Sequence, residues 1–378
     1  MTNNTRPAGL LCVGLQGLAL DDDIRSLLDR GVAGVILFAR NVESPAQVAR
    51  LCHDLKQHAG RPLLIMTDQE GGATTRLRDG FTPLPSMRAL GDTADPAVAR
   101  QVGAVIGQEL RAVGIDMALA PVLDVDTNPD NPVIGSRSLS RDPAVVAAMG
   151  GALIEGIQSQ GVAACAKHFP GHGDTAQDSH YALPRLPHAM GRLEQVELPP
   201  FRAAAAQGVA SMMSAHIVFE AIDPERPATL SPAVLQGVLR ESLGFEGVAI
   251  SDCMEMKAIA DPGDLGGDDP PREHVPAAVL AGIQAGLDLA LVSHTAELAH
   301  AAIDRLDAAV DDGSLAPDRL EQAMQRVAQL TDHYARPAAP GNLAALNTPQ
   351  ANTLTRPMIE QDADTDLSAD PTQALGKG

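Results

Sequence analysis

The feature that most constrains the fold is an alternation of short apolar runs with longer amphipathic segments, which continues through most of the 378 residues. The short runs are typical of buried strands, and the longer segments are typical of helices that cover a sheet. The eight predicted strands are Leu10–Leu15, Ala33–Phe38, Leu63–Met66, Asp116–Leu119, Val162–Ala166, Ala210–Ser214, Gly247–Ile250 and Asp288–Val292. Repeated strand–helix units of this kind indicate a parallel sheet in an α/β protein.

Five of the seven predicted helices begin at a Ser or Asp capping residue, and several have a proline in the first turn, as helix N-termini prefer. They are Asp22–Arg30, Ser44–His58, Asp95–Arg111, Asp142–Ser159, Arg192–Ala206, Ser231–Ser242 and Arg272–Ala285. Eight strands with helices between them favour a single-domain (β/α)₈ barrel of the TIM type over residues 1–336, and a doubly wound open sheet is the alternative.

The C-terminal segment differs in composition from the rest of the chain. From Pro337 onward it is rich in proline, has no aromatic residue and shows little apolar periodicity. We therefore expect residues 337–378 to form a Pro-rich, disordered tail.

Charge and composition exclude several classes of partner. Lys and Arg total 28 against 48 Asp and Glu, which gives a formal net charge of −20, and no basic cluster is present. A nucleic-acid or anionic-membrane surface is therefore not expected. No apolar run reaches the roughly 18 residues that span a bilayer. The apolar segment Ala8–Leu20 is interpreted as the first core strand and not as an export signal, because only Arg6 precedes it and no small-x-small cleavage pattern follows.

The cysteines indicate the compartment. Cys12, Cys52, Cys165 and Cys253 form no C-x-x-C pair and have no metal-ligand spacing. Neither a disulfide framework nor a zinc-thiolate site is indicated, so a reducing, cytoplasmic location is expected.

Ionisable residues follow six of the eight predicted strands. In a parallel barrel the loops after the strands converge on one face, where active sites of this fold lie. An Asp at a strand end also caps helices and loop amides, so each residue taken alone is equally well explained by a structural role. The residues concerned are Asp68, Glu70, Asp124, Asp126, Lys167, His168, His216, Asp252 and His294.

The densest group of such residues lies in the segment KHFPGHGDTAQDSHYALP, residues 167–184. It contains His, Asp and Lys side chains suited to metal binding, to loop hydrogen bonds or to acid/base chemistry. Pro170, Gly171 and Gly173 interrupt the segment, and the helical spacing of common zinc motifs is absent. As an acid/base loop, Asp178 could orient His180 and raise its pKa.

Four strings together resemble glycoside hydrolase family 3, in particular its single-domain bacterial β-N-acetylhexosaminidases. They are TDQEGG, APVLDVD with IGSRSLSRDP, KHFPGHGDTAQDSH, and SDCMEM. The similarity runs from about Val13 to Val292, and the long His-rich string is its most specific part.

The resemblance implies a catalytic set and a sugar-binding set. Asp252 matches the family's nucleophile, His180 its acid/base and Asp178 the partner of that histidine. The positions that bind the terminal N-acetylglucosamine are matched by Asp68, Arg76, Arg137, Lys167 and His168.

The expected activity is therefore a retaining exo-β-N-acetylhexosaminidase that releases N-acetylglucosamine from peptidoglycan-derived fragments. We expect a monomer with a small carbohydrate substrate and no metal or organic cofactor. A family 3 β-glucosidase, a β-N-acetylglucosaminide phosphorylase, a metal-dependent hydrolase that uses the residue 167–180 cluster, and a non-catalytic sugar-binding protein are the alternatives.

Overall fold

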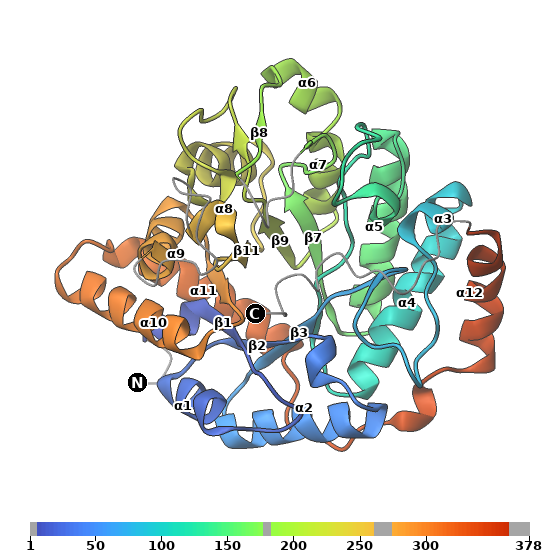
Figure 1. The fold of residues 1–378 in the computed structure, drawn as a ribbon, viewed down its shortest axis with the longest axis horizontal. Coiled ribbons are helices and arrows are strands. Elements are labelled where there is room, and N and C mark those ends of the chain that lie inside the picture. Colours follow the sequence, from blue (N-terminus) through green and yellow to red (C-terminus); the bar gives the residue numbers. More distant parts are fainter. Residues whose placement is uncertain (1–5, 177–182, 261–273, 363–378) are drawn as a thin grey trace.

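The computed structural model describes residues 6–176, 183–260 and 274–362. Eight parallel strands form a closed barrel in the order β1-β12-β11-β9-β7-β6-β3-β2 (Figure 1). Each of them falls on one of the eight predicted strands. The barrel strands are β1 (Leu11–Gly14), β2 (Gly34–Leu37), β3 (Leu64–Thr67), β6 (Met117–Ala118), β7 (Ala163–Phe169), β9 (Ser211–Ser214), β11 (Val248–Cys253) and β12 (Leu289–Val292). The predicted (β/α)₈ barrel is thus confirmed, and the open sheet is wrong.

Two small strand pairs lie outside the barrel. β4 (Gln69–Gly71) pairs antiparallel with β5 (Thr74–Thr75), and β8 (Arg185–Leu186) pairs with β10 (Val218–Phe219). The first pair follows β3 directly, so it shapes the loop at the carboxyl end of that strand.

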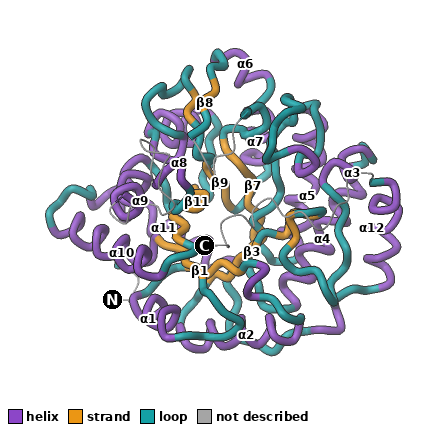
Figure 2. Tube along the Cα trace, in the orientation of Figure 1, coloured by secondary structure: helices purple, strands orange, loops and turns teal. Residues whose placement is uncertain are grey.

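Helices surround the barrel, with the strands at the centre of the molecule (Figure 2). They are α1 (Asp22–Arg30), α2 (Pro45–Ala59), α3 (Met87–Asp92), α4 (Pro96–Ala112), α5 (Pro143–Ser159), α6 (Met190–Gln195), α7 (Leu198–Ala206), α8 (Lys257–Ala260), α9 (His274–Ala285), α10 (Ala296–Asp311), α11 (Pro317–Tyr334) and α12 (Pro349–Gln361), together with a π-helical segment at Ala233–Ser242. No helix in this part of the chain is both long and apolar enough to cross a membrane.

The predicted caps and prolines account for several helix starts. Ser44, Asp95 and Asp142 each accept a hydrogen bond from a backbone amide in the first turn of the next helix, as predicted. Helix α1 is capped by Asp21, one residue before the predicted cap Asp22. The predicted helix 192–206 is instead divided into α6 and α7. Two consecutive prolines, at positions 199 and 200, occupy the first turn of α7, where the missing amide hydrogens cost least.

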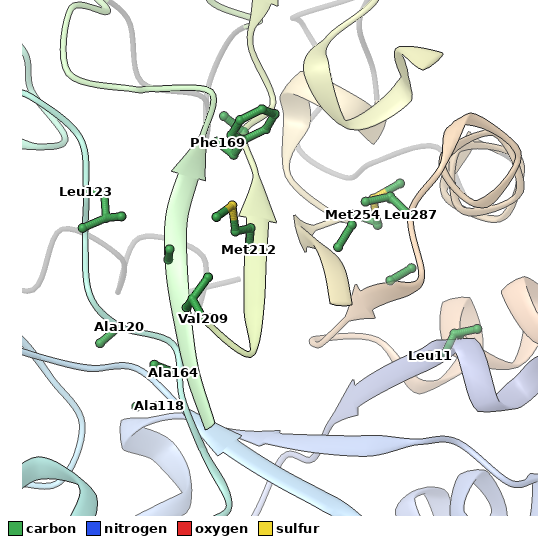
Figure 3. Close-up of a cluster of buried hydrophobic side chains, with 14 of the residues drawn as sticks. Leu11, Ala118, Ala120, Leu123, Ala164, Phe169, Val209, Met212, Met254 and Leu287 are labelled. Atoms are coloured by element: carbon green, nitrogen blue, oxygen red, sulfur yellow. The ribbon is translucent and has the colours of Figure 1, made fainter. Parts of the chain in front are cut away.

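The core has two layers, because successive strand residues point to opposite faces. On β3, Leu64 and Met66 point into the barrel, whereas Ile65 packs toward the helices. The same alternation on β7 places Cys165 inside and Ala164 in the outer layer with Leu123 and Met212 (Figure 3). Phe169 also lies in the outer layer, because the pairing of β7 with β9 shifts register between Lys167 and Phe169. Aliphatic and sulfur-containing side chains therefore fill the barrel, which closes without any tryptophan.

The expected disorder of the tail is wrong for residues 337–362. Helix α12 packs against α3 and α4 (Figure 1). The backbone amide of Asn347 donates a hydrogen bond to the buried carboxylate of Glu109 at 2.7 Å. Ala351, Thr355 and Met358 recur at helical spacing and are all buried, so a short apolar stripe is present that the proline content obscured. The remaining tail, residues 363–378, lies outside the described residues.

The packing of α12 can be tested at its buried methionine. Met358 is 6% exposed and belongs to the main core cluster, so Met358→Ala should lower the free energy of unfolding by about 2–5 kcal/mol. Chemical denaturation of the full chain measures this change. Arg356→Ala, at an exposed position of the same helix, is the control and should change stability by less than about 0.5 kcal/mol. Equal effects of the two variants would contradict the docking of α12.

Candidate active site

A pocket opens at the carboxyl ends of the barrel strands. Six of the eight predicted site residues line it, although they come from four separate loops and strand ends. They are Asp68, Arg76, Arg137, Lys167, His168 and Asp252. This is the end of the barrel at which the catalytic residues of this fold are found.

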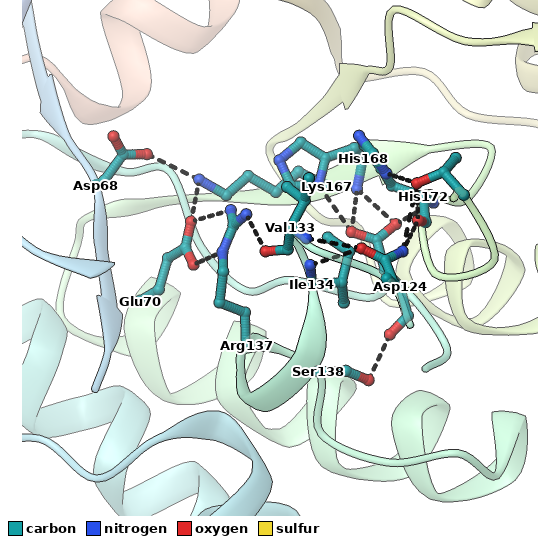
Figure 4. Close-up of polar contacts among 12 residues, drawn as sticks. Asp68, Glu70, Asp124, Val133, Ile134, Arg137, Ser138, Lys167, His168 and His172 are labelled. Carbon is teal, nitrogen blue, oxygen red and sulfur yellow. Dashed lines mark hydrogen bonds and ion pairs between the residues drawn. The ribbon is translucent and has the colours of Figure 1, made fainter. Parts of the chain in front are cut away.

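Lys167 is the centre of a buried ion-pair network (Figure 4). Its Nζ lies 2.8 Å from Asp68 Oδ1 and 2.6 Å from Glu70 Oε1. Arg137 binds the same Glu70 through two hydrogen bonds, of 2.8 and 2.9 Å, and also donates to the carbonyl of Val133. The network thereby joins the loop after β3, the end of β7 and the segment that precedes α5. Such paired, bidentate contacts fix side-chain orientation as well as charge.

Arg76 completes the network by donating to Asp68 Oδ2 at 3.0 Å. Burial alone would raise the pKa values of Asp68 and Glu70, but the neighbouring cations outweigh burial and hold both pKa values below their ordinary range. Both carboxylates are therefore ionised at neutral pH. Three cationic side chains surround these two anions, which leaves the network with a surplus positive charge.

Asp124 holds the two histidines that follow β7. Its carboxylate accepts hydrogen bonds from the backbone amides of His168 and His172 and lies 2.7 Å from His168 Nδ1. Burial tends to raise the pKa of Asp124, but His168 and His172 lower it overall, so the carboxylate is ionised. An ionised partner makes Nδ1 of His168 the hydrogen-bond donor. The ring nitrogen Nε2 is then the polar atom that His168 offers to a ligand in the pocket.

Asp252 ends β11 on the same pocket. Its Oδ1 accepts a hydrogen bond from the backbone amide of Cys253 at 2.7 Å, and the side chain is only partly buried. Burial raises the pKa of the neighbouring Cys253 to about 12, so this thiol stays protonated at neutral pH. The reactive group that β11 presents to the pocket is therefore the Asp252 carboxylate.

An aromatic pair forms another wall of the pocket. The rings of Phe38 and His294 stack with centroids 5.3 Å apart, and the guanidinium of Arg40 lies 4.6 Å from the centre of the Phe38 ring. Met256 lines the pocket beside them. This wall is held by packing contacts and cation–π attraction, in contrast to the ion pairs around Lys167.

The two remaining predicted residues, Asp178 and His180, lie outside the described residues. Described residues before and after this segment contact each other: His188 Nε2 lies 2.5 Å from Asp174 Oδ2, and the Thr127 hydroxyl donates a hydrogen bond to Asp174. Among the described residues, no three His, Cys, Asp or Glu side chains gather in a way that could hold a metal ion.

Sequence reasoning missed three members of the site: Glu70, Asp124 and His172. Glu70 and Asp124 were noticed only as strand-end carboxylates. The sequence feature that could have identified them is their position at strand ends: Glu70 lies two residues after Asp68, and Asp124 follows the fourth predicted strand. Their partners lie 67 and 44 residues away, which no local pattern reveals.

The titration of His172 is a measurable property of this site. Burial, assisted by repulsion from His168, lowers the pKa of His172 to about 4, and its Nδ1 lies 2.7 Å from Thr175 Oγ1. Between pH 6.5 and 4 the unfolded chain binds a proton here that the folded chain does not. Stability should therefore decrease by about 3 kcal/mol from this residue as the pH falls through that window. NMR titration of the His172 ring should show a neutral imidazole at pH 5, and a midpoint of 6 or above would contradict the prediction.

Comparison with known proteins identifies the family of the chain. Residues 13–330 match the family model described as the glycosyl hydrolase family 3 N terminal domain. The chain is 42% identical to a beta-hexosaminidase of Thiobacillus denitrificans over 79% of this chain and 82% of that protein. It is also 37% identical to a beta-hexosaminidase of Pseudomonas aeruginosa over 90% of this chain and 98% of that one.

Two solved structures share the fold. The family 3 β-N-acetylglucosaminidase of Paenibacillus sp. str. FPU-7 superposes with a TM-score of 0.87 at 41% identity, covering 96% of this chain and 69% of that chain. NagZ of Neisseria gonorrhoeae, in complex with N-trifluoroacetyl-D-glucosamine, gives a TM-score of 0.76 at 31% identity, covering 94% of this chain and 99% of that chain. With the family model matched over most of its length, the chain belongs to glycosyl hydrolase family 3 and is a glycoside hydrolase.

Proposed function

We propose that this protein is a retaining exo-β-N-acetylglucosaminidase with Asp252 as its nucleophile. The observation that carries the proposal is that the Asp252 carboxylate opens into the same pocket as the Asp68, Arg76 and Lys167 cluster. A retaining glycosidase needs such a carboxylate beside a sugar held by fixed polar groups. The relatives named beta-hexosaminidase, and the Neisseria NagZ crystallised with an N-acylated glucosamine, support the acetamido sugar as the substrate.

The polar groups of the pocket fit the hydroxyls of one sugar. Each hydroxyl both donates and accepts a hydrogen bond. The ionised Asp68 would accept from hydroxyls, whereas Arg76 and Lys167 would donate to them, and His168 Nε2 would accept. Arg137 is already engaged by Glu70 and the Val133 carbonyl, so we assign it the task of holding Glu70, and through it Lys167, in place.

The proposed reaction has two steps. In the first, an Asp252 oxygen attacks the anomeric carbon while the glycosidic C–O bond breaks and the leaving oxygen takes a proton from His180. In the second, His180 removes a proton from water, whose oxygen attacks the anomeric carbon and releases the Asp252 carboxylate. Asp178 would orient the His180 ring. A histidine with a pKa near 6.5 can serve as acid and then as base at neutral pH.

We extend the proposal to the biological substrate and its location. The substrates would be N-acetylglucosaminyl fragments of peptidoglycan, cleaved in the cytoplasm by a monomer that needs no cofactor. The free and buried thiols of Cys12, Cys52, Cys165 and Cys253 are compatible with a reducing compartment. Release of N-acetylglucosamine from purified muropeptides, followed by chromatography, tests the substrate directly.

Substrate preference is the first test of the function. The purified protein should release p-nitrophenol from p-nitrophenyl β-N-acetylglucosaminide much faster than from the matched β-glucoside, because the acetamido group is part of what the pocket binds. Added phosphate should leave the rate unchanged, since water is the proposed acceptor. Preference for the glucoside would instead indicate a β-glucosidase, phosphate-dependent release a phosphorylase, and no turnover a binding protein.

Two variants should fail in different ways. Asp252→Asn should remove turnover of every N-acetylglucosaminide, because no glycosyl-enzyme ester can form. His180→Ala should lower the rate by roughly 10²–10⁴-fold on substrates with poor leaving groups but far less on those with good ones, which need little protonation. Rates measured across a series of aryl leaving groups, together with mass spectrometry of the trapped intermediate, separate the two roles.

The matched controls are exposed residues that do not line the pocket. Asp130→Asn and His333→Ala remove the same functional groups at exposed positions and should behave like the wild type. Full turnover by Asp252→Asn would refute the nucleophile assignment. An equal loss on all leaving groups in His180→Ala would refute the role of His180 as an acid.

A further inference from the structure

A second charged cluster lies at the opposite end of the barrel, around Asp288. This residue directly precedes β12, and its side chain is fully buried. Three guanidinium groups contact its carboxylate, from Arg240 at 2.5 Å, Arg319 at 2.7 Å and Arg326 at 3.2 Å. Arg240 belongs to the π-helical segment, and the other two belong to α11. The cluster thus joins two surrounding helices to the amino-terminal end of the barrel.

The cluster has more positive charge than its carboxylate can balance. Burial, together with repulsion from Arg326 and Arg319, outweighs the attraction of Asp288 and lowers the pKa of Arg240 to about 10. The Nε atoms of Arg240 and Arg319 are both buried and have no acceptor within the described part of the chain. Buried N–H groups without partners are rare in folded proteins and costly.

A shallow pocket adjoins this cluster, and we call it the basal pocket. It is lined by Arg240 and Arg326 and by Gln322, Gln325 and Gln329, which share one face of α11. The side-chain oxygen of Gln322 accepts a hydrogen bond from Arg319 at 3.3 Å, so its NH₂ group remains to donate to a ligand.

The far side of the basal pocket is formed by the turn before β11. The ring of Phe245 lies 5.0 Å from the guanidinium of Arg240 and shields that charge from water. Glu246 is the acidic residue on the pocket lining, and it is exposed. Arg240 and Arg326 are partly buried, whereas the three glutamines and Glu246 are exposed, so the lining carries two positive charges, three side-chain amides and one negative charge.

We propose that the basal pocket binds a small phosphate-type oxyanion, either inorganic phosphate or the phosphate group of a monoester. A planar guanidinium matches phosphate oxygens geometrically, and glutamine amides add neutral donors. A bound oxyanion would balance the surplus charge of the three arginines. It would also link α11 to the π-helical segment, so it would stabilise the packing of these helices at the amino-terminal end of the barrel. This site is separate from the catalytic pocket, which lies at the carboxyl ends of the strands.

Thermal unfolding of the full chain in phosphate tests the proposal. A ligand that binds only the folded state raises Tm in a saturable, concentration-dependent way. We expect phosphate to raise Tm well beyond chloride at the same ionic strength, and glucose 6-phosphate to act like phosphate if monoesters fit. Arg326→Gln should weaken the apparent affinity at least about tenfold, because it removes one charge-assisted donor. Its turnover of p-nitrophenyl β-N-acetylglucosaminide should stay unchanged.

A charge-mimicking variant provides the complementary test. Gln329→Glu places a carboxylate beside the arginines, so it should raise Tm in chloride and abolish the further rise in phosphate. Gln57→Glu adds the same charge at an exposed position of α2 and should do neither. Arg356→Gln, exposed on α12, is the matched control for Arg326→Gln.

The catalytic pocket also contains cationic side chains, so its contribution must be separated. Lys167→Met removes a cation there and should keep the full phosphate effect if the basal pocket is the site. Loss of the effect in Lys167→Met with its retention in Arg326→Gln would overturn the proposal. A shift no larger in phosphate than in chloride would overturn it as well.

Discussion

The ion-pair network around Lys167 is the interaction on which the catalytic end of the molecule depends. Lys167, Glu70 and Arg137 are almost completely buried, and each of these charges is matched by at least one partner within hydrogen-bonding distance. Removing charges from water is costly unless partners and geometry compensate for it. The loops after β3 and β6 and the end of β7 must therefore keep fixed positions relative to one another. The same contacts that hold them also shape the sugar-binding pocket.

At both ends of the barrel, buried carboxylates form ion pairs with several basic side chains, but the two clusters have different roles. At the carboxyl ends of the strands, Asp68 and Glu70 arrange three cations around an open pocket beside Asp252. At the amino-terminal ends, the single carboxylate of Asp288 gathers three arginines from helices outside the barrel. The first arrangement orients groups toward a ligand. The second attaches the outer helices to the strands and retains a surplus charge that is itself able to attract an anion.

The barrel was predictable from the sequence because its strands are short apolar runs separated by well-capped helices. Six site residues were predictable because strand ends in a parallel barrel converge, and because the quoted strings resemble those of a known family. The pairing of Glu70 with Arg137 was not predictable, since it joins positions 67 residues apart through tertiary geometry alone. Helix α12 was missed because proline content outweighed a stripe of only three buried residues. The Asp288 cluster was missed because its arginines look like ordinary exposed helix residues in the sequence.

The two kinds of wall around the catalytic pocket differ in how much change they can accept. Around Lys167, a substitution leaves a buried charge without its partner, and the cost spreads to the fold. Phe38, His294 and Met256 form a wall of stacked and packed side chains, where a change of shape alters volume without leaving a buried charge unpaired. Directed evolution of this enzyme toward other acyl groups or aglycones should therefore randomise the Phe38 wall first. Substitutions there can change which substrates fit the pocket at a smaller cost in folding stability than substitutions around Lys167.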